Sequence, residues 1–271
     1  IWLPFLQAFI VHLDEMDWFD CTYIGFDERR NMETALDLIA SVQNKDGKML
    51  KTSAAFNDFR HNAPVFNRLN YASVGLQQIR EHLQDFKNQV RLRRENGQEI
   101  TMYTATEHVP NSFTKSVPAE SYWTILFAGA LNTTGFLRWA YDAWVENPLE
   151  DSTHWSFPAG DCFLVYPSLK NEKNPESKFS LRLAKLDEGV RDVNKLYMMR
   201  ENAHAVSPEI EKLFSAVKGE TENSYEFYTM AKTNLWGRKA KWLTEHGKQE
   251  ILADTAEAKQ KIYEISKLYC A

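Results

Sequence analysis

The sequence predicts an α/β protein with a parallel sheet. Short apolar runs alternate with amphipathic segments of helical period, and this alternation is typical of parallel strands joined by helical crossovers. The crossovers are evenly spaced, and the GxGxxG fingerprint of a dinucleotide-binding sheet is absent. We therefore expect part of an eight-stranded (β/α)8 TIM barrel rather than a doubly wound sheet.

Five segments have the pattern of strands. Each is short and apolar, with polar residues or an amphipathic segment after it. In chain order they are "CTYIGF" (21–26), "KMLKTSAAF" (48–56), "LNYASVG" (69–75), "EITMYTAT" (99–106) and "TGFLRWAYDAW" (134–144).

Helices are predicted between these strands and at the end of the chain. In 4–16, Phe5, Phe9, His12 and Leu13 have helical spacing, and Asn31 is a candidate N-cap for a helix over 31–43. The remaining predicted helices are 76–96 as one long amphipathic helix with Gly97 beyond its end, 121–132, and most of the chain from Leu186 onward.

Composition excludes several classes of protein. The net charge is −5 and no basic run is long, which argues against a nucleic-acid partner. Charges interrupt every apolar run, so no membrane span is predicted. The three cysteines are far apart and the histidines form neither HxH nor HExxH, so we expect no zinc site, disulfide framework or cofactor. Aromatic residues make up 13% of the chain, which suits flat apolar ligands such as sugar rings.

The chain begins without methionine, in the apolar run "IWLPFLQAFIVHL". This run has neither the basic region nor the small-residue cleavage site of a signal peptide. We expect it to be the interior of a longer polypeptide, and the sequence leaves the localisation open.

Two adjacent acids, Asp27 and Glu28, follow the first predicted strand. In α/β barrels the chemistry takes place at the carboxyl ends of the strands. The dipeptide itself carries no information, because the chain has four adjacent acidic pairs and chance predicts roughly five. Only the position after "TYIGF" makes this pair a candidate site.

The segment "TYIGFDER", ahead of an amphipathic helix, resembles the strand-four acid motif of the glycoside hydrolase family 123 catalytic domain, a group that includes many uncharacterised relatives. Further segments resemble the family in the same order, over about residues 5–200. They are "PNSFTKSVPAE" (110–120), "GFLRWAYDAWVENPLEDS" (135–152), "AGDCFLVYP" (159–167) and "SLRLAKLDEGVRDVNKL" (180–196). Arg29 departs from the pattern, since many relatives carry proline there, and Asp161 leads into Cys162.

The resemblance implies an architecture. The five strands would be strands four to eight of the barrel, within a partial catalytic domain over 1–200 that is followed by a helical C-terminal extension over 201–271. Five strands cannot close a barrel, because both edges would keep unpaired backbone groups. We therefore expect upstream polypeptide to supply the remainder of the barrel. These enzymes usually carry a β-sandwich before the barrel in the chain, and it too would lie upstream.

The resemblance also implies a mechanism. It is that of a retaining exo-β-N-acetylhexosaminidase, with N-acetylgalactosamine as the favoured sugar, in which the substrate's own acetamido oxygen is the nucleophile. Asp27 would accept the acetamido N–H, and Glu28 would protonate the leaving oxygen and then activate water. The charge of Asp27 would raise the pKa of Glu28. The reverse assignment of the two acids stays open.

Four residues are candidates for substrate binding. Tyr103 would polarise the acetamido carbonyl, with a place in the core as an equal alternative. Trp139 would lie under the sugar ring in preference to core packing, and Tyr141 shares its face. Asp161 would bind sugar hydroxyls or make a turn beside Gly160.

Other polar and aromatic residues have weaker claims. We expect Arg182, Arg191 and Asp192 to form salt bridges that hold the last helix on the barrel. Trp144 and Trp155 are expected to be structural or rim residues. The loop histidines, His61 and His108, line the cleft or are simply solvated.

Two other functions stay open. The first is a non-catalytic carbohydrate-binding barrel, against which the intact Asp27–Glu28 pair argues. The second is a glycosidase of different sugar specificity, because part of the wall around the ring 4-hydroxyl would come from the missing strands. A carbohydrate is the expected partner under each function.

Overall fold

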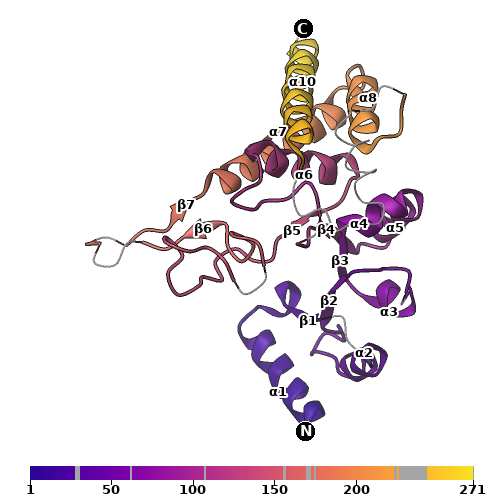
Figure 1. The fold of residues 1–271 in the computed structure, drawn as a ribbon. Coiled ribbons are helices and arrows are strands. Elements are labelled where there is room, and N and C mark those ends of the chain that lie inside the picture. Colours follow the sequence, from indigo (N-terminus) through magenta and orange to yellow (C-terminus); the bar gives the residue numbers. More distant parts are fainter. Residues whose placement is uncertain are drawn as a thin grey trace. The chain divides into compact units, whose positions relative to one another are not determined.

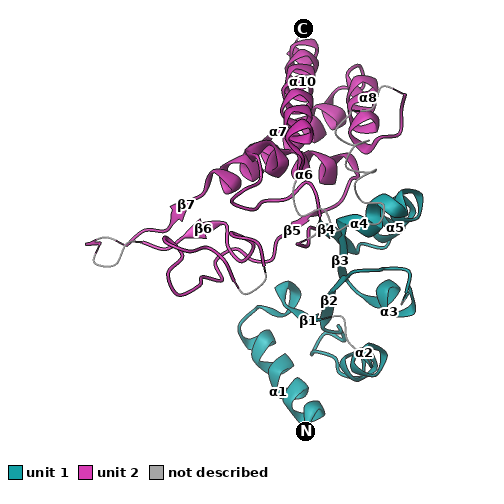
Figure 2. Cartoon of the chain, in the orientation of Figure 1, with its two compact units in different colours: residues 1–102 teal, residues 103–271 magenta. Residues whose placement is uncertain are grey.

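The computed structural model describes residues 1–27, 31–61, 63–106, 108–154, 157–168, 172–173, 175–222, 225 and 243–270 (Figure 1). The chain divides into two compact units, residues 1–102 and residues 103–271, drawn in teal and magenta in Figure 2. Each unit is considered by itself.

Unit 1 alternates helices and strands as predicted. Its elements are α1 (Trp2–Glu15), the short 3-10 helix η1 (Phe19–Cys21), β1 (Tyr23–Phe26), α2 (Met32–Ala40), β2 (Lys51–Phe56), α3 (Ala63–Arg68), β3 (Tyr71–Gly75), α4 (Leu76–Glu81), α5 (Leu83–Glu95) and β4 (Glu99–Tyr103), whose last residue is assigned to unit 2.

The strands of unit 1 confirm the predicted parallel sheet. β1 pairs in parallel with β2, with Phe26 opposite Ala54, and β2 pairs in parallel with β3, with Phe56 opposite Val74. The strand order within unit 1 is β1-β2-β3-β4. This order, with helices between successive strands, is the arrangement that βαβ connections produce.

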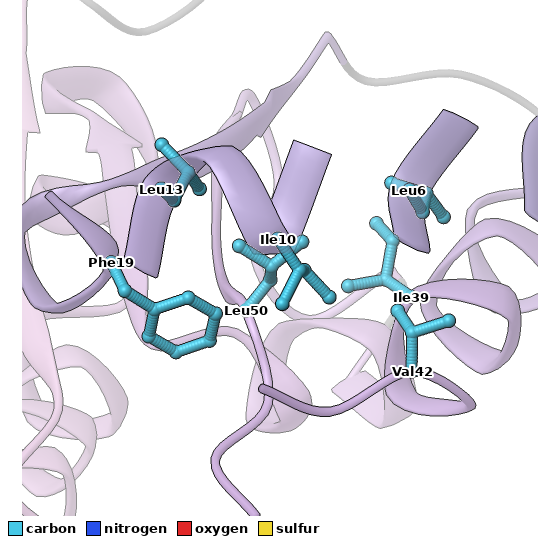
Figure 3. Packing of buried hydrophobic residues seen from close by; sticks show 7 residues of the cluster. All are labelled: Leu6, Ile10, Leu13, Phe19, Ile39, Val42 and Leu50. Carbon is cyan, nitrogen blue, oxygen red and sulfur yellow. The ribbon is translucent and has the colours of Figure 1, made fainter. Parts of the chain in front are cut away.

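Helix α1 forms where predicted, but its buried face differs from the predicted one. Leu6, Ile10 and Leu13 are buried, whereas Phe5 is 54% exposed. The buried residues join a core cluster with residues of η1, of α2 and of the segment after α2; its members are Leu6, Ile10, Leu13, Phe19, Ile39, Val42 and Leu50 (Figure 3). The helix is apolar on almost every side, so periodicity does not decide which stripe faces the core.

The prediction of one continuous helix over 76–96 is wrong. It is two helices, α4 and α5, because the backbone at His82 leaves helical geometry (φ −131°, ψ 47°). After the break α5 buries Phe86, Val90 and Arg93. Apolar spacing continues through His82, and spacing alone is insensitive to a change of backbone at one residue.

Unit 2 is mostly helical, as predicted for the end of the chain. Its elements are α6 (Pro118–Ala130), β5 (Gly135–Leu137), β6 (Val165–Tyr166), β7 (Lys178–Phe179), α7 (Leu181–Asn202), α8 (Ser207–Lys218) and α10 (Glu245–Cys270). In the described part of the chain, no helix is both long enough and apolar enough to cross a membrane.

Helices α6 and α7 pack closely at two glycines. A Cβ at Gly129 would lie 2.6 Å from the methyl groups of Val193, and one at Gly189 would lie 2.8 Å from Ile125. The Tyr197 hydroxyl on α7 donates to the Gly129 carbonyl oxygen at 2.7 Å. Small residues at the crossing let the two helices approach, so most side chains of α6 are buried.

The strand predicted over 134–144 is much shorter than expected. β5 ends at Leu137, and beyond it the chain makes an isolated antiparallel bridge between Asp142 and Phe163. Within residues 162–167, only the short strand β6 forms, and it pairs antiparallel with β7. The shortening of β5 follows from pairings with distant residues, which local patterns do not encode.

Candidate active site

Asp27 directly follows β1, at the carboxyl end of that strand, and its side chain is exposed. The pairing of Phe26 with Ala54 fixes the register immediately before it. Tyr23 at the start of β1 donates to the Glu99 carboxylate at 3.0 Å, which ties β1 to residues of β4 in unit 1. The strand end therefore presents the Asp27 carboxyl to solvent. Glu28 and Arg29 lie outside the described residues.

Tyr103 is the last residue of β4 and is half-buried. Its ring centroid lies 6.4 Å from that of His108, at an interplanar angle of 37°. His108 itself is buried, and its Nδ1 accepts from the Ala105 backbone N–H at 2.8 Å. The predicted solvated role is therefore wrong for His108. It holds for His61, whose side chain is 86% exposed.

Buried polar side chains hold the segment between β4 and α6. The Asn111 amide donates to the Ala105 carbonyl at 2.7 Å, and its oxygen accepts from the Thr104 hydroxyl at 3.1 Å. The Glu120 carboxylate accepts from the backbone N–H groups of Asn111 (3.0 Å) and Val117 (3.2 Å). Burial nevertheless raises the pKa of Glu120 to about 7, because desolvation outweighs the two hydrogen bonds.

The sequence reasoning missed Asn111 and Glu120. A signal for Glu120 exists, because Pro118 at the first position and a glutamate at the third are typical of a helix start. Asn111 has no comparable local signal, since its partners are defined by the folded loop.

Just beyond β5, Trp139 and Tyr141 lie on the same, exposed face, as their spacing in the sequence predicts. Trp139 is 61% exposed and Tyr141 is 51% exposed, whereas the Arg138 side chain between β5 and these rings is buried. Trp139 is therefore not a core residue, and most of it is open to solvent. Trp144 is also exposed, and its Nε1 donates to the Val165 carbonyl at 2.8 Å. Trp155 lies outside the described residues.

Asp161 is buried and forms an ion pair with Arg138. The Arg138 Nη2 atom lies 3.3 Å from Asp161 Oδ1. Burial raises the pKa of Asp161, although the charge of Arg138 opposes this, and burial likewise lowers the pKa of Arg138. Asp161 also has the predicted turn role, because its N–H donates to the Pro158 carbonyl and Gly160 has a φ of +80°.

The start of α7 is held in unit 2 by Arg182, which among the described residues bonds to backbone carbonyls and does not form the predicted salt bridge. Its Nη1 donates to the carbonyl oxygens of Ser112 (2.8 Å) and Gly160 (2.6 Å). Burial lowers its pKa. Arg191 pairs with Asp187 within α7, and Asp192 accepts from the Tyr122 hydroxyl of α6 at 2.7 Å.

Cys21, Cys162 and Cys270 are free thiols. Within the described ranges, no group of three or more His, Cys, Asp or Glu side chains is arranged to hold a metal ion.

Comparison with known proteins gives a family match and similar solved structures. The model of the family "Glycoside hydrolase 123, catalytic domain" matches residues 1–199. Among solved structures, the chain is similar to a family 123 glycoside hydrolase from Clostridium perfringens, studied for glycolipid glycan hydrolysis, with 31% sequence identity and a TM-score of 0.82.

The structural match covers 99% of this chain and 45% of the Clostridium perfringens protein, so the chain spans less than half the length of that relative. A search of curated proteins finds no match. Since the family model covers residues 1–199 of 271, the chain belongs to the glycoside hydrolase 123 catalytic domain family.

Proposed function

We propose that the protein is a glycosidase of the retaining, substrate-assisted exo-β-N-acetylhexosaminidase type, with N-acetylgalactosamine as the favoured sugar. The observation that carries the proposal is the family match over residues 1–199, which include the Asp27–Glu28 pair after a parallel strand. The exposure of Asp27 supports it, because an acid that orients a substrate must be reachable from solvent. A carbohydrate is the substrate class that the family implies.

In this mechanism the acetamido carbonyl oxygen of the substrate attacks the anomeric carbon, and the bond to the leaving oxygen breaks. Glu28 gives its proton to that oxygen, and Asp27 accepts the acetamido N–H and stabilises the oxazolinium cation. Water then attacks the anomeric carbon and loses a proton to Glu28, which opens the oxazolinium ring. Two inversions at one carbon leave its configuration unchanged.

The binding roles extend to aromatic residues. We assign Trp139 to the apolar face of the sugar ring, which its 61% exposure permits, and Tyr141 to the same binding surface. Tyr103 is assigned to the acetamido carbonyl, and its half-buried position supports this role over full burial in the core. Asp161 is assigned to substrate binding through its partner Arg138, since its own carboxyl is buried.

We also propose the finer architecture. Strands β1 to β5 would belong to a (β/α)8 barrel, with residues 1–200 as the partial catalytic domain and residues 201–271 as a helical extension. The parallel pairing of β1, β2 and β3 supports this proposal.

The test uses the full-length protein and 4-nitrophenyl N-acetyl-β-galactosaminide. We expect cleavage, with competitive inhibition by a thiazoline that mimics the oxazolinium. Turnover without any effect of the thiazoline would rule out the substrate-assisted route. Cleavage of an unsubstituted β-galactoside instead would indicate a different specificity.

The acid is tested by Glu28→Gln, with Glu33→Gln as the matched control because Glu33 is exposed in the first turn of α2. We expect Glu28→Gln to lower kcat by about 10²–10⁴-fold, with azide restoring turnover, and the control to retain wild-type activity. Sugar binding without turnover in the wild type, unchanged in Glu28→Gln, would favour a non-catalytic carbohydrate-binding protein.

A further inference from the structure

Three aromatic side chains are exposed on residues 138–144, which we call the aromatic segment. They belong to Trp139, Tyr141 and Trp144. The segment lies beyond the end of β5 and is not a regular strand. Rings that are exposed on such a segment keep a fixed direction only if other contacts hold their backbone.

Part of this support is a set of backbone hydrogen bonds to residues 161–165. The Ala140 N–H donates to the Asp161 carbonyl at 3.2 Å, and the Ala143 N–H donates to the Cys162 carbonyl at 3.2 Å. In the other direction, the Leu164 N–H donates to the Tyr141 carbonyl at 2.8 Å. The aromatic segment is thus paired along its length with residues 161–165.

The Arg138–Asp161 ion pair closes one end of this pairing. Both side chains are buried, at 6% and 4% exposure. Besides Asp161, the Arg138 guanidinium donates to the Trp139 carbonyl beside it and to the Gly160 carbonyl across the pairing, at 3.5 Å. The Arg138 guanidinium therefore bonds to the backbone of both paired segments, next to Trp139, the first exposed ring.

The turn at 158–161 is anchored from outside the aromatic segment as well. Arg182 Nη1 donates to the Gly160 carbonyl, and the Thr114 N–H donates to the Ala159 carbonyl at 2.9 Å. A Cβ at Gly160 would lie 2.7 Å from Arg182 Nη1 and 2.9 Å from Thr114 Cγ2. The turn therefore gives Asp161 a fixed position from which to hold Arg138.

We propose that Arg138 and Asp161 are positioning residues for substrate binding: their buried ion pair fixes the backbone of the aromatic segment, and thereby the directions of Trp139 and Tyr141. This inference rests on the proposed function for its substrate, a sugar whose apolar face stacks on an aromatic ring. It assigns Asp161 a role through Arg138 instead of a direct contact with sugar hydroxyls. Removing either charge leaves the other buried without compensation, and the backbone then loses its fixed geometry.

The first test does not depend on activity. Asp161→Asn is compared with the wild type and with the control Glu146→Gln, which alters an exposed acid near the aromatic segment. We expect faster amide hydrogen exchange in a peptide covering 138–146 for Asp161→Asn only, with exchange in α10 unchanged as a sign that unit 2 is folded. Unchanged exchange in 138–146 would overturn the positioning role, whatever the activity.

The second test separates positioning from chemistry. In the full-length protein, we expect Asp161→Asn to raise KM for the 4-nitrophenyl substrate about tenfold with a smaller change in kcat. Trp139→Ala should raise KM in the wild type but add little in the Asp161→Asn background, because both changes remove the same ring contact. A loss of kcat with unchanged KM would instead indicate a direct catalytic role and overturn the proposal.

Arg138→Lys covers the case in which Asp161→Asn does not fold. It keeps the charge but loses the planar fork that reaches Asp161, Trp139 and Gly160 together. We expect partial loosening of 138–146 and a partial rise in KM. Wild-type exchange in this variant would contradict the proposal. If the wild type shows no turnover, the proposed function fails while the exchange experiment still tests the positioning.

Discussion

Loop backbone is held by a buried arginine in unit 1, and by both a buried arginine and a buried carboxyl in unit 2. In unit 1, Arg93 donates to three backbone carbonyls, those of Glu99 (3.1 Å), Phe66 (3.0 Å) and Leu69 (2.7 Å). In unit 2, Arg182 donates to two carbonyls in the same way, but a buried carboxyl also has this role, because Glu120 accepts from two backbone N–H groups. In both units, a charged side chain provides hydrogen-bond partners for backbone groups of loops.

The difference matters for pH. Burial lowers the pKa of Arg93 to about 10, so this group remains charged throughout the neutral range. Burial raises the pKa of Glu120 to about 7, so its charge changes near neutrality. The comparison teaches that the same kind of anchor gives a pH-insensitive unit when it is an arginine and a pH-sensitive unit when it is a carboxyl.

The largest expected effect is in unit 1. Arg93→Met leaves three carbonyl oxygens without their donor, and we expect the free energy of unfolding to fall by about 3–5 kcal/mol. Urea unfolding measures it, with faster hydrogen exchange in β3 locating the effect in unit 1. Arg94→Met is the control, because Arg94 is the exposed neighbour. Equal stabilities of the two variants would show that Arg93 is no anchor.

The second effect sharpens the pH contrast. The pKa of Glu120 is higher in the folded protein than its ordinary value of 4.5, so its contribution to stability is fully present below about pH 4.5 and is lost as the pH rises through about 7. The loss amounts to about 3 kcal/mol.

Glu120→Gln has no such titration. Between pH 4.5 and pH 8, we expect the wild type to lose about 3 kcal/mol more of its free energy of unfolding than this variant, measured by urea unfolding at each pH. Parallel curves for the two proteins would contradict the role of Glu120. Arg93→Lys should leave the wild-type pH dependence in place, because it changes only unit 1.

The smallest effect compares glycines. Gly129→Ala brings a Cβ to 2.6 Å from Val193, and we expect a loss of about 1–3 kcal/mol from the overpacked α6–α7 crossing. The matched change in unit 1 is Gly25→Ala, whose Cβ would meet its nearest atom, Ser53 Oγ, at an ordinary 3.7 Å. Thermal unfolding should separate the two variants. A Gly25→Ala that is as unstable as Gly129→Ala would mean that the contact distance does not decide the cost.

Much of unit 1 is predictable from the sequence because its signals are local. Apolar runs and helical spacing identify β1 to β4 and α2, whose buried residues Met32, Leu36 and Ile39 lie four and three residues apart, as on one face of a helix. The choice of the buried face of α1 and the break at His82 are not predictable in this way. Both depend on the residues that pack against the helix, and the periodicity of the sequence does not contain that information.

Unit 2 is less predictable because its decisive contacts join distant residues. Nothing near Arg138 indicates a partner 23 residues away, and nothing near Arg182 indicates the carbonyls of Ser112 and Gly160. The pattern did predict the alternation that leaves Trp139 and Tyr141 on one face. It could not distinguish an acid in a turn that binds sugar from one that holds an arginine.

The anchoring of Gly160 by Arg182 has a consequence for the order in which the molecule is made. Residues 138–161 are synthesised before Arg182, so the Gly160 carbonyl gains this donor only once the start of α7, at Leu181, has been made. The segment that carries the exposed rings is therefore secured late, by a residue that follows it in the chain. A nascent chain that stops short of α7 already has its aromatic rings but still lacks the group that holds the turn beside them.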